Sequence, residues 1–100
     1  MLKHIVMWKL KESANGKTKE ENALLLKEKL EALVGEIAEL RSLEVGINAI
    51  ESNASYDIVL TTTFDKEADL KSYAVNPKHV LVSDFCSSIR ESRVVVDYLI

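Results

Sequence analysis

The period of the hydrophobic pattern changes along this chain, and these changes limit its fold more than any other feature. Apolar and polar residues alternate over residues 2–11, 43–47 and 56–64, which is typical of half-buried strands. The last stretch, residues 93–100, is rich in β-branched residues and is also strand-like. In the segments between these stretches, apolar residues recur at spacings of three and four, which is typical of amphipathic helices. The order strand, helix, strand, strand, helix, strand predicts an α+β fold, in which helices cover one face of a four-stranded antiparallel sheet.

Capping residues locate the starts of the expected helices. Thr18 and Glu21 have the spacing of a capping box, in which each side chain bonds a free backbone N–H at a helix start. Asp65 is expected to cap a second, short helix. Asn76 suits an N-cap and Pro77 suits the first helical position, so Pro77 either ends that short helix or begins another. The expected apolar stripes are Ala23, Leu26, Leu30, Leu33 and Ile37 in the first helix, and Val80, Phe85 and Ile89 in the last segment.

Composition narrows the class of protein. The chain has 100 residues, 47% of them apolar and 29% charged, which is ordinary for a single globular domain spanning residues 1–100. Its net charge of −3 argues against a nucleic-acid partner, because a phosphate-binding surface needs a basic excess or stripe. No membrane partner is expected, since no apolar run reaches spanning length and the start lacks a secretion-signal pattern. The single cysteine, Cys86, cannot form an internal disulfide, so we expect a cytoplasmic location.

The strands are apolar on both faces of the expected sheet. The face expected beneath the helices carries Val6, Trp8, Ile58, Leu60, Val94 and Val96. The opposite face would then expose one apolar patch made by Ile5, Met7, Val59, Val95 and Leu99. Packing a second copy of the sheet face to face would bury this patch and give a two-fold symmetric homodimer. The alternative is a monomer whose patch is interrupted by Lys3, Lys9, Thr61, Thr63 and Asp97.

Five segments of the chain together resemble one protein family. The segments are KHIVMWKLK (3–11), LRSLEVGIN (40–48), YDIVLTTTFD (56–65), SYAVNPKHV (72–80) and ESRVVVDY (91–98). In this order and spacing the chain is similar to the stress-responsive A/B barrel domain family, also called Dabb, over nearly its whole length. The resemblance implies a ferredoxin-like βαββαβ chain that dimerises into an α+β barrel. It implies no single activity, because most members have none assigned.

The resemblance also suggests site residues. A plant polyketide cyclase of this kind closes a linear polyketide acid by aldol chemistry, in a cavity between sheet and helices. Its catalytic histidine and tyrosine after the second helix correspond to His79 and Tyr73, and its first-strand histidine corresponds to His4. Its further pocket histidine and tyrosine correspond to Ile58 and Leu30. These apolar residues would keep the pocket apolar while removing groups that transfer protons.

The position of His79 has a physical consequence of its own. After Asn76 and Pro77, it takes the third position of a helix, where exposed N–H dipoles place partial positive charge beside its ring. This disfavours the imidazolium, so we expect a neutral ring near pH 7 that could serve as a base. Equally, His79 could simply tie the helix end to Tyr73 or to a backbone carbonyl. His4 faces inward and needs a hydrogen-bond partner, for which His79 or Tyr73 is the expected candidate.

Other residues complete the expected cavity and surface. The candidate ligand-binding residues are His4, Trp8, Leu30, Tyr56, Ile58, Tyr73 and His79, of which His4, Tyr73 and His79 are also the candidate catalytic residues. Tyr98 is expected to face inward as well. Asp57, Asp97 and Arg93 are expected on the outer face, where they could pair between subunits. Scattered glycines and only two histidines give no phosphate loop and no metal motif, so no cofactor and no metal is expected.

Three functions remain open from the sequence, and it does not decide whether the chain is an enzyme. The first is a protein that binds a small apolar or aromatic molecule and has no chemistry of its own. The second is a cofactor-independent cyclase or isomerase, with His79 as general base and Tyr73 or His4 polarising a carbonyl. The third is a structural role, against which a cavity of roughly 300 Å³ or more would count.

Overall fold

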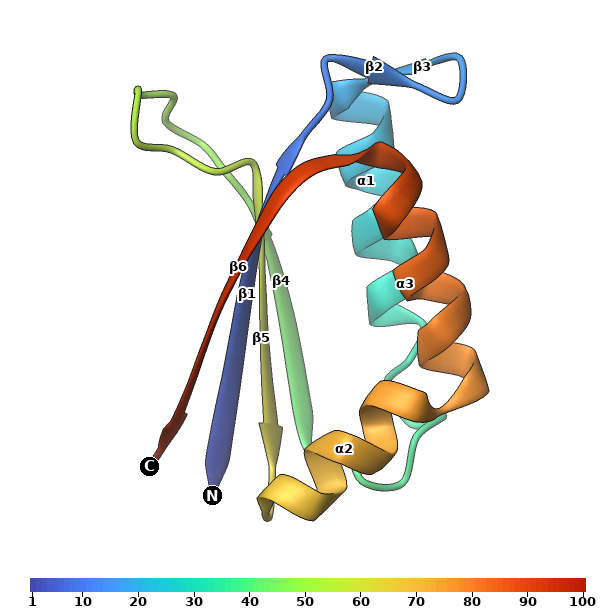
Figure 1. The fold of residues 1–100 in the computed structure, drawn as a ribbon, viewed down its shortest axis with the longest axis vertical. Coiled ribbons are helices and arrows are strands. Elements are labelled where there is room, and N and C mark those ends of the chain that lie inside the picture. Colours follow the sequence, from blue (N-terminus) through green and yellow to red (C-terminus); the bar gives the residue numbers. More distant parts are fainter.

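The computed structural model covers residues 1–100 and confirms the predicted sheet with helices on one face. The antiparallel sheet has the strand order β4 (Ser42–Ile47), β5 (Ile58–Phe64), β1 (Leu2–Leu10) and β6 (Arg90–Leu99). Helices α1 (Lys19–Glu31) and α3 (Pro77–Ile89) cover one face, and α2 (Glu67–Val75) joins β5 to α3 at the lower end (Figure 1). None of the helices combines the length and the apolar character needed to cross a bilayer. The other face of the sheet carries no helix (Figure 1).

The first helix starts as its sequence predicts. A hairpin precedes it, formed by the short strands β2 (Ser13–Ala14) and β3 (Lys17–Thr18). Its turn residues Asn15 and Gly16 have φ values of 55° and 75°, a left-handed conformation that asparagine and glycine tolerate best. Thr18 Oγ1 accepts a hydrogen bond from the Glu21 N–H at 3.2 Å, and Glu21 Oε1 accepts one from the Thr18 N–H at 2.9 Å. The predicted capping box is therefore confirmed.

The start of α3 agrees with the prediction, whereas the start of α2 differs from it. Asn76 caps α3, because its Oδ1 accepts the backbone N–H two residues on at 2.9 Å, and Pro77 is the first helical residue. Asp65 does not cap α2, whose N-cap is Lys66 without a side-chain bond. Instead, Arg41 donates to Asp65 Oδ2 from Nη2 at 2.8 Å and from Nε at 3.1 Å. The expected cap was wrong because the charge-assisted pair engages this carboxylate.

The core lies between the sheet and helices α1 and α3. All five residues of the predicted first stripe are buried, namely Ala23, Leu26, Leu30, Leu33 and Ile37, but α1 ends at Glu31, so Leu33 and Ile37 lie beyond the helix in which they were expected. On α3 the buried residues are Val82, Cys86 and Ile89, whereas Val80 is exposed and Phe85 is half-buried. The predicted stripe for α3 is therefore right at Ile89 and partly right at Phe85, which packs against the core, and it is wrong at Val80. A separation of five residues places Val80 and Phe85 about 140° apart on a helix, too far to share one face.

Strand β6 presents the opposite faces from those predicted. Its register pairs Asp97 with His4 and Val95 with Val6, and directly paired residues share a face of the sheet. The helix side therefore receives Arg93, Val95, Asp97 and Leu99, and the outer side receives Val94, Val96 and Tyr98. Three consecutive valines are apolar on both faces, so alternation alone could not decide between them. The corrected outer patch comprises Ile5, Met7, Val59, Val94, Val96 and Tyr98.

Candidate functional site

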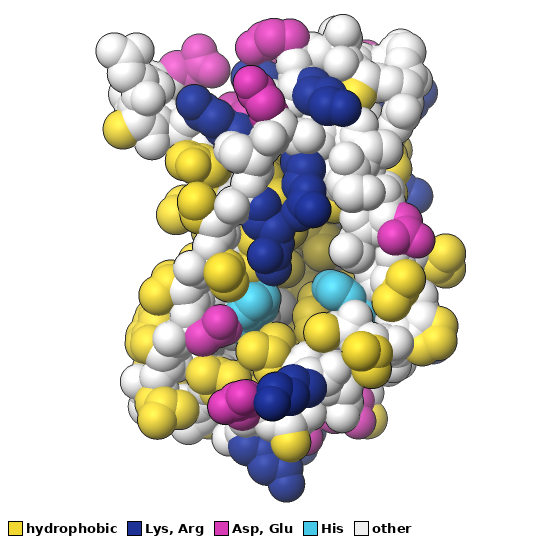
Figure 2. All heavy atoms as spheres, in the orientation of Figure 1, with side chains coloured by type: hydrophobic (Ala, Val, Ile, Leu, Met, Phe, Trp, Pro, Cys, Tyr) yellow, Lys and Arg dark blue, Asp and Glu magenta, His cyan; other side chains and the backbone are white.

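A cavity of about 200 Å³ lies between the sheet and helices α1 and α3. Its apolar wall comprises Val6, Leu26, Leu30, Leu60, Val82 and Cys86. Figure 2 shows the hollow from outside, with the two histidine side chains on either side of it and basic side chains above. The volume is below the roughly 300 Å³ typical of drug-sized ligand sites, so on size alone a structural role is not excluded. It does exceed the ~150 Å³ of an apolar cavity known to accept benzene, and so has room for a single ring.

The structure brings five of the seven predicted ligand-binding residues to this cavity. They are His4, Trp8, Leu30, Tyr73 and His79. Ile58 is buried in the core but does not line the cavity. Tyr56 precedes β5, and its ring lies with its centroid 5.9 Å from Lys9 Nζ instead. Tyr98 lies on the outer face, where the register of β6 places it.

His79 is held at the cavity by its own helix end and by an aromatic neighbour. Its Nδ1 lies 3.1 Å from the carbonyl oxygen of Ala74, which can only accept, so Nδ1 carries the proton and Nε2 keeps a free lone pair. Its ring packs on Tyr73, with centroids 4.3 Å apart. Burial lowers the pKa of His79, the hydrogen bond to the Ala74 carbonyl partly opposes this, and the neighbouring His4 and Arg93 add to the lowering. The neutral ring predicted from the sequence follows, with burial as the main cause.

His4 has a partner that sequence reasoning missed. Its Nδ1 lies 2.5 Å from Oδ1 of Asp97, with 12% of the histidine side chain and 40% of the aspartate side chain exposed. The expected partners, His79 and Tyr73, were wrong because Asp97 was placed on the outer face. A carboxylate at Nδ1 holds the ring in one orientation and leaves Nε2 available for another group.

Two hydrogen-bond donors on the cavity wall have no partner within the protein. The buried side-chain polar atoms without a partner are Trp8 Nε1, Tyr73 Oη and Asn22 Oδ1, and only the first two belong to cavity residues. Burial raises the pKa of Tyr73 to about 12, so its hydroxyl stays protonated and able to donate. An unsatisfied buried donor costs about 1–3 kcal/mol. Two residues of the cavity wall thus carry buried donors that lack a partner in the protein.

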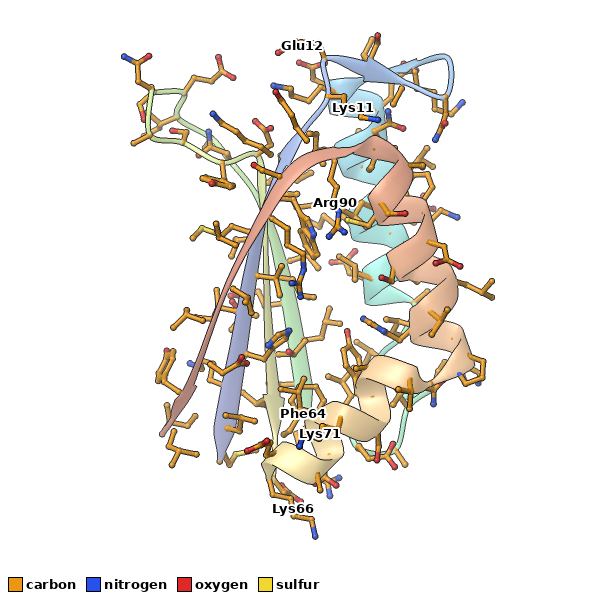
Figure 3. All side chains as sticks on the ribbon, viewed as in Figure 1. Lys11, Glu12, Phe64, Lys66, Lys71 and Arg90 are labelled. Atoms are coloured by element: carbon orange, nitrogen blue, oxygen red, sulfur yellow. The ribbon has the colours of Figure 1, made fainter.

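Two arginines also line the cavity, and neither was among the predicted site residues. Arg90 is half-buried, and Figure 3 shows its side chain running into the space between the sheet and the helices. Arg93 is exposed and was expected on the outer face, but the register of β6 turns it toward the helices. No feature of the sequence indicates this placement, because the opposite parity of the strand is wholly apolar from residue 94 to 98 and was therefore expected to face the helices.

Other parts of the molecule offer weaker sites. A hollow of about 290 Å³ runs along the outside of α1 and α3. Two of its three charged residues already pair with each other, since Lys78 Nζ lies 3.2 Å from Glu36 Oε2. No group of three or more His, Cys, Asp or Glu side chains is arranged to hold a metal ion. The cavity beneath the sheet is therefore the best candidate site.

Solved structures share this fold. A dimeric protein of unknown function with a ferredoxin-like fold from Bacteroides fragilis is 35% identical, with a TM-score of 0.82, and the match covers 99% of this chain and 95% of that one. A Dabb family protein from Mesorhizobium loti is 24% identical, with a TM-score of 0.74 and coverage of 99% and 95%. A hydroxynitrile lyase from Passiflora edulis is 19% identical, with a TM-score of 0.78 and coverage of 99% and 92%. These likenesses confirm the predicted ferredoxin-like fold.

The sequence itself settles the family. No curated protein sequence matches the chain significantly. The profile of one family, described as the stress responsive A/B barrel domain, matches residues 2–100. The match spans the strand that carries His4, the helix that carries His79 and the arginine-bearing strand β6. The chain therefore belongs to the stress responsive A/B barrel (Dabb) domain family.

Proposed function

We propose that this protein binds a small apolar or aromatic molecule in the cavity between its sheet and helices. The observation that carries the proposal is the pair of unpartnered buried donors, Trp8 Nε1 and Tyr73 Oη, on residues that line a mainly apolar cavity. A ligand with one acceptor atom satisfies a donor that otherwise costs about 1–3 kcal/mol. Its apolar part fills the cavity, whose volume of about 200 Å³ suits a single ring.

The binding unit is a homodimer formed by sheet-to-sheet packing. Similar solved proteins are described as dimeric, including the one at 35% identity. The outer patch of the sheet supplies a suitable surface, because Met7, Val94, Val96 and Tyr98 are all exposed on neighbouring strands. A second copy that covers this patch face to face gives the barrel.

The cytoplasm is the proposed location. Cys86 is the one cysteine, it is buried, and burial raises the pKa of its thiol to about 11. A single neutral, buried thiol that forms no disulfide fits a reducing compartment such as the cytoplasm. Cell fractionation followed by immunoblotting tests this, and recovery in a membrane or secreted fraction would contradict it.

Tryptophan fluorescence tests the binding proposal directly. Trp8 is the only tryptophan and lies on the cavity wall, so its emission reports on occupancy. We expect saturable changes on titration with ring-sized probes such as phenol, benzyl alcohol and benzoate. Leu30→Phe adds bulk to the cavity wall and should abolish the change. Leu24→Phe is the matched control, because Leu24 lies on the same helix and is 61% exposed. Absence of any saturable change, or equal binding by both variants, would refute the proposal.

A second candidate function is proton transfer next to a carbonyl, without a cofactor. It is favoured by the free Nε2 of neutral His79 and by the Asp97 carboxylate that orients His4. In this scheme His79 Nε2 takes a proton from the carbon beside the carbonyl. Tyr73 or His4 then donates a hydrogen bond to the enolate oxygen that forms.

Hydrogen–deuterium exchange tests this second function. A ring-sized ketone such as acetophenone is incubated with the protein in D₂O, and loss of its methyl proton signal is followed by NMR. Catalysis predicts exchange above the buffer rate that His79→Gln removes. If the ketone binds to the wild-type protein but exchanges only at the buffer rate, the proton-transfer function is rejected and the binding function remains.

A further inference from the structure

The polar groups on the cavity wall are mainly donors. Trp8 and Tyr73 each present one buried donor without a partner, and Arg90 and Arg93 add two guanidinium groups. No ion pair and no side-chain hydrogen bond in the protein involves either of these arginines. The third arginine of the chain, Arg41, shows the contrast, because it makes two hydrogen bonds to a carboxylate.

The nearby acidic group does not neutralise this pair. Asp97 lies on the same side of β6 as Arg93, but its Oδ1 is engaged by His4 Nδ1 at 2.5 Å. The positive charge of the arginines also affects the pKa values of neighbouring cavity residues. Arg93 lowers the pKa of His79, and both arginines lower the pKa of Cys86 against the larger opposing effect of burial. Two guanidinium groups thus stand beside a donor-rich cavity without a counter-ion from the protein.

We infer that the ligand is an anion, namely a small aromatic or apolar carboxylic acid whose carboxylate is held by Arg90 and Arg93. Its ring lies deeper in the cavity, against Leu30 and Val82. The planar guanidinium group suits this task, because it can bind both carboxylate oxygens at once. The chain carries a net charge of −3, so the attraction is local to these two residues. This inference rests on the proposed binding function and specifies its ligand class.

Matched acid and amide probes separate charge from shape. We propose titrating benzoate against benzamide and phenylacetate against phenylacetamide at pH 7 and low salt, with Trp8 fluorescence as the readout. The members of each pair have nearly the same size, but only the acids are charged. Because hydrogen bonds to charged groups contribute more than neutral ones, we expect the acids to bind at least about tenfold more tightly. Added salt should reduce this preference and leave amide binding nearly unchanged.

Variants assign the preference to the two arginines. Arg90→Met and Arg93→Met should each weaken acid binding toward the level of the amide and should change the amide affinity much less. Lys66→Met is the matched control, since it removes the same charge from an exposed residue at the lower end of the molecule, away from Arg90 (Figure 3). Arg90→Lys and Arg93→Lys keep the charge but lose the planar group, so intermediate affinities are expected.

Each outcome decides between the proposals. Equal affinity of the wild-type protein for acid and amide would overturn the carboxylate inference and leave the binding function standing. No binding of either member of a pair would overturn both. An acid preference that survives in both methionine variants would place the anion elsewhere and overturn the assignment to these arginines. Circular dichroism establishes that each variant is folded, and the wild-type comparison decides the ligand class even where a methionine variant is not.

Discussion

At the scale of single residues, His79 combines a structural and a chemical role. Its Nδ1–H donates to the carbonyl of Ala74 and its ring packs on Tyr73, so it ties the start of α3 to the end of α2. Nε2 stays unprotonated because burial lowers the pKa of the ring, which lines the cavity. Both alternatives drawn from the sequence, a helix-end contact and a neutral base, are thus compatible in one side chain.

The pH dependence of stability should reveal the environment of His79. Burial lowers its pKa in the folded protein below the ordinary value of 6.5, so between these two values the unfolded chain binds more protons. The free energy of unfolding should be fully retained above about pH 6.5 and should fall as pH drops through the folded pKa. Urea unfolding between pH 5 and 7.5 measures this. His79→Gln should remove the part of this pH dependence that His79 contributes, so its free energy of unfolding should fall less below pH 6.5 than that of the wild-type protein. The same pH dependence in both proteins would contradict the lowered pKa.

The hydroxyl of Tyr73 should add nothing to the stability of the ligand-free protein. Tyr73→Phe removes a buried donor that has no partner and keeps the ring against Phe64, whose centroid lies 5.1 Å away. We expect the free energy of unfolding to stay the same or to rise by up to about 1 kcal/mol. Tyr73→Ala should lower it by about 3–5 kcal/mol, because a large cavity opens. A marked loss in Tyr73→Phe, measured by urea unfolding, would show that the hydroxyl does have a partner.

At the scale of elements, the start of α3 determines where the site residue His79 lies. Asn76 has an extended backbone and caps the helix, and Pro77 supplies a backbone conformation already suited to its first turn. This arrangement follows from local chemistry, which is why NPKHV could be interpreted from sequence. The face that the rest of α3 buries depends on how the helix packs on the sheet, and the predicted stripe was only partly right there.

Removing the cap of α3 should measurably destabilise the protein. Asn76→Ala should lower the free energy of unfolding by about 1 kcal/mol, because the backbone N–H of Lys78 then loses the side-chain oxygen to which it donates. Asn76→Asp keeps an accepting oxygen and should restore most of it. Asn53→Ala, in an exposed loop, is the matched control and should change stability by less than about 0.5 kcal/mol. Equal effects of Asn76→Ala and Asn53→Ala would argue against the cap.

At the scale of the whole molecule, the uncovered face of the sheet is the surface on which the proposed dimer would form. Helices cover only one side, and the register of β6 turns Val94, Val96 and Tyr98 to the other (Figure 1). This arrangement makes the outer patch more apolar than expected, because Asp97 leaves it for the cavity side. The correction to β6 therefore strengthens the case for sheet-to-sheet packing.

A charge placed in this patch should disrupt the dimer. Val96→Glu adds a carboxylate to an exposed residue that the proposed interface would bury, so dissociation to monomers is expected in sedimentation analysis. Leu24→Glu, on the exposed face of α1, is the control and should remain dimeric. A dimer that persists in Val96→Glu would locate the interface elsewhere.

The order of the main elements and the starts of α1 and α3 were determined by the sequence itself, because their causes are local. Period-two alternation, the Thr18 capping box and the Asn76–Pro77 start act within a few residues, and each was predicted correctly. The resemblance to the family placed His4, Tyr73 and His79, which the structure brings to one cavity.

Only the tertiary structure decided which side of β6 meets the helices. Residues 94–96 are all valine, so either face satisfies the hydrophobic pattern, and the choice comes from pairing with β1, whose register shifts between Lys9 and Leu10. That one choice gives His4 its carboxylate, moves Arg93 to the cavity and leaves Tyr98 on the outer face. Strand register depends on residues far apart in the chain, and a pattern that is apolar on both faces carries no record of it.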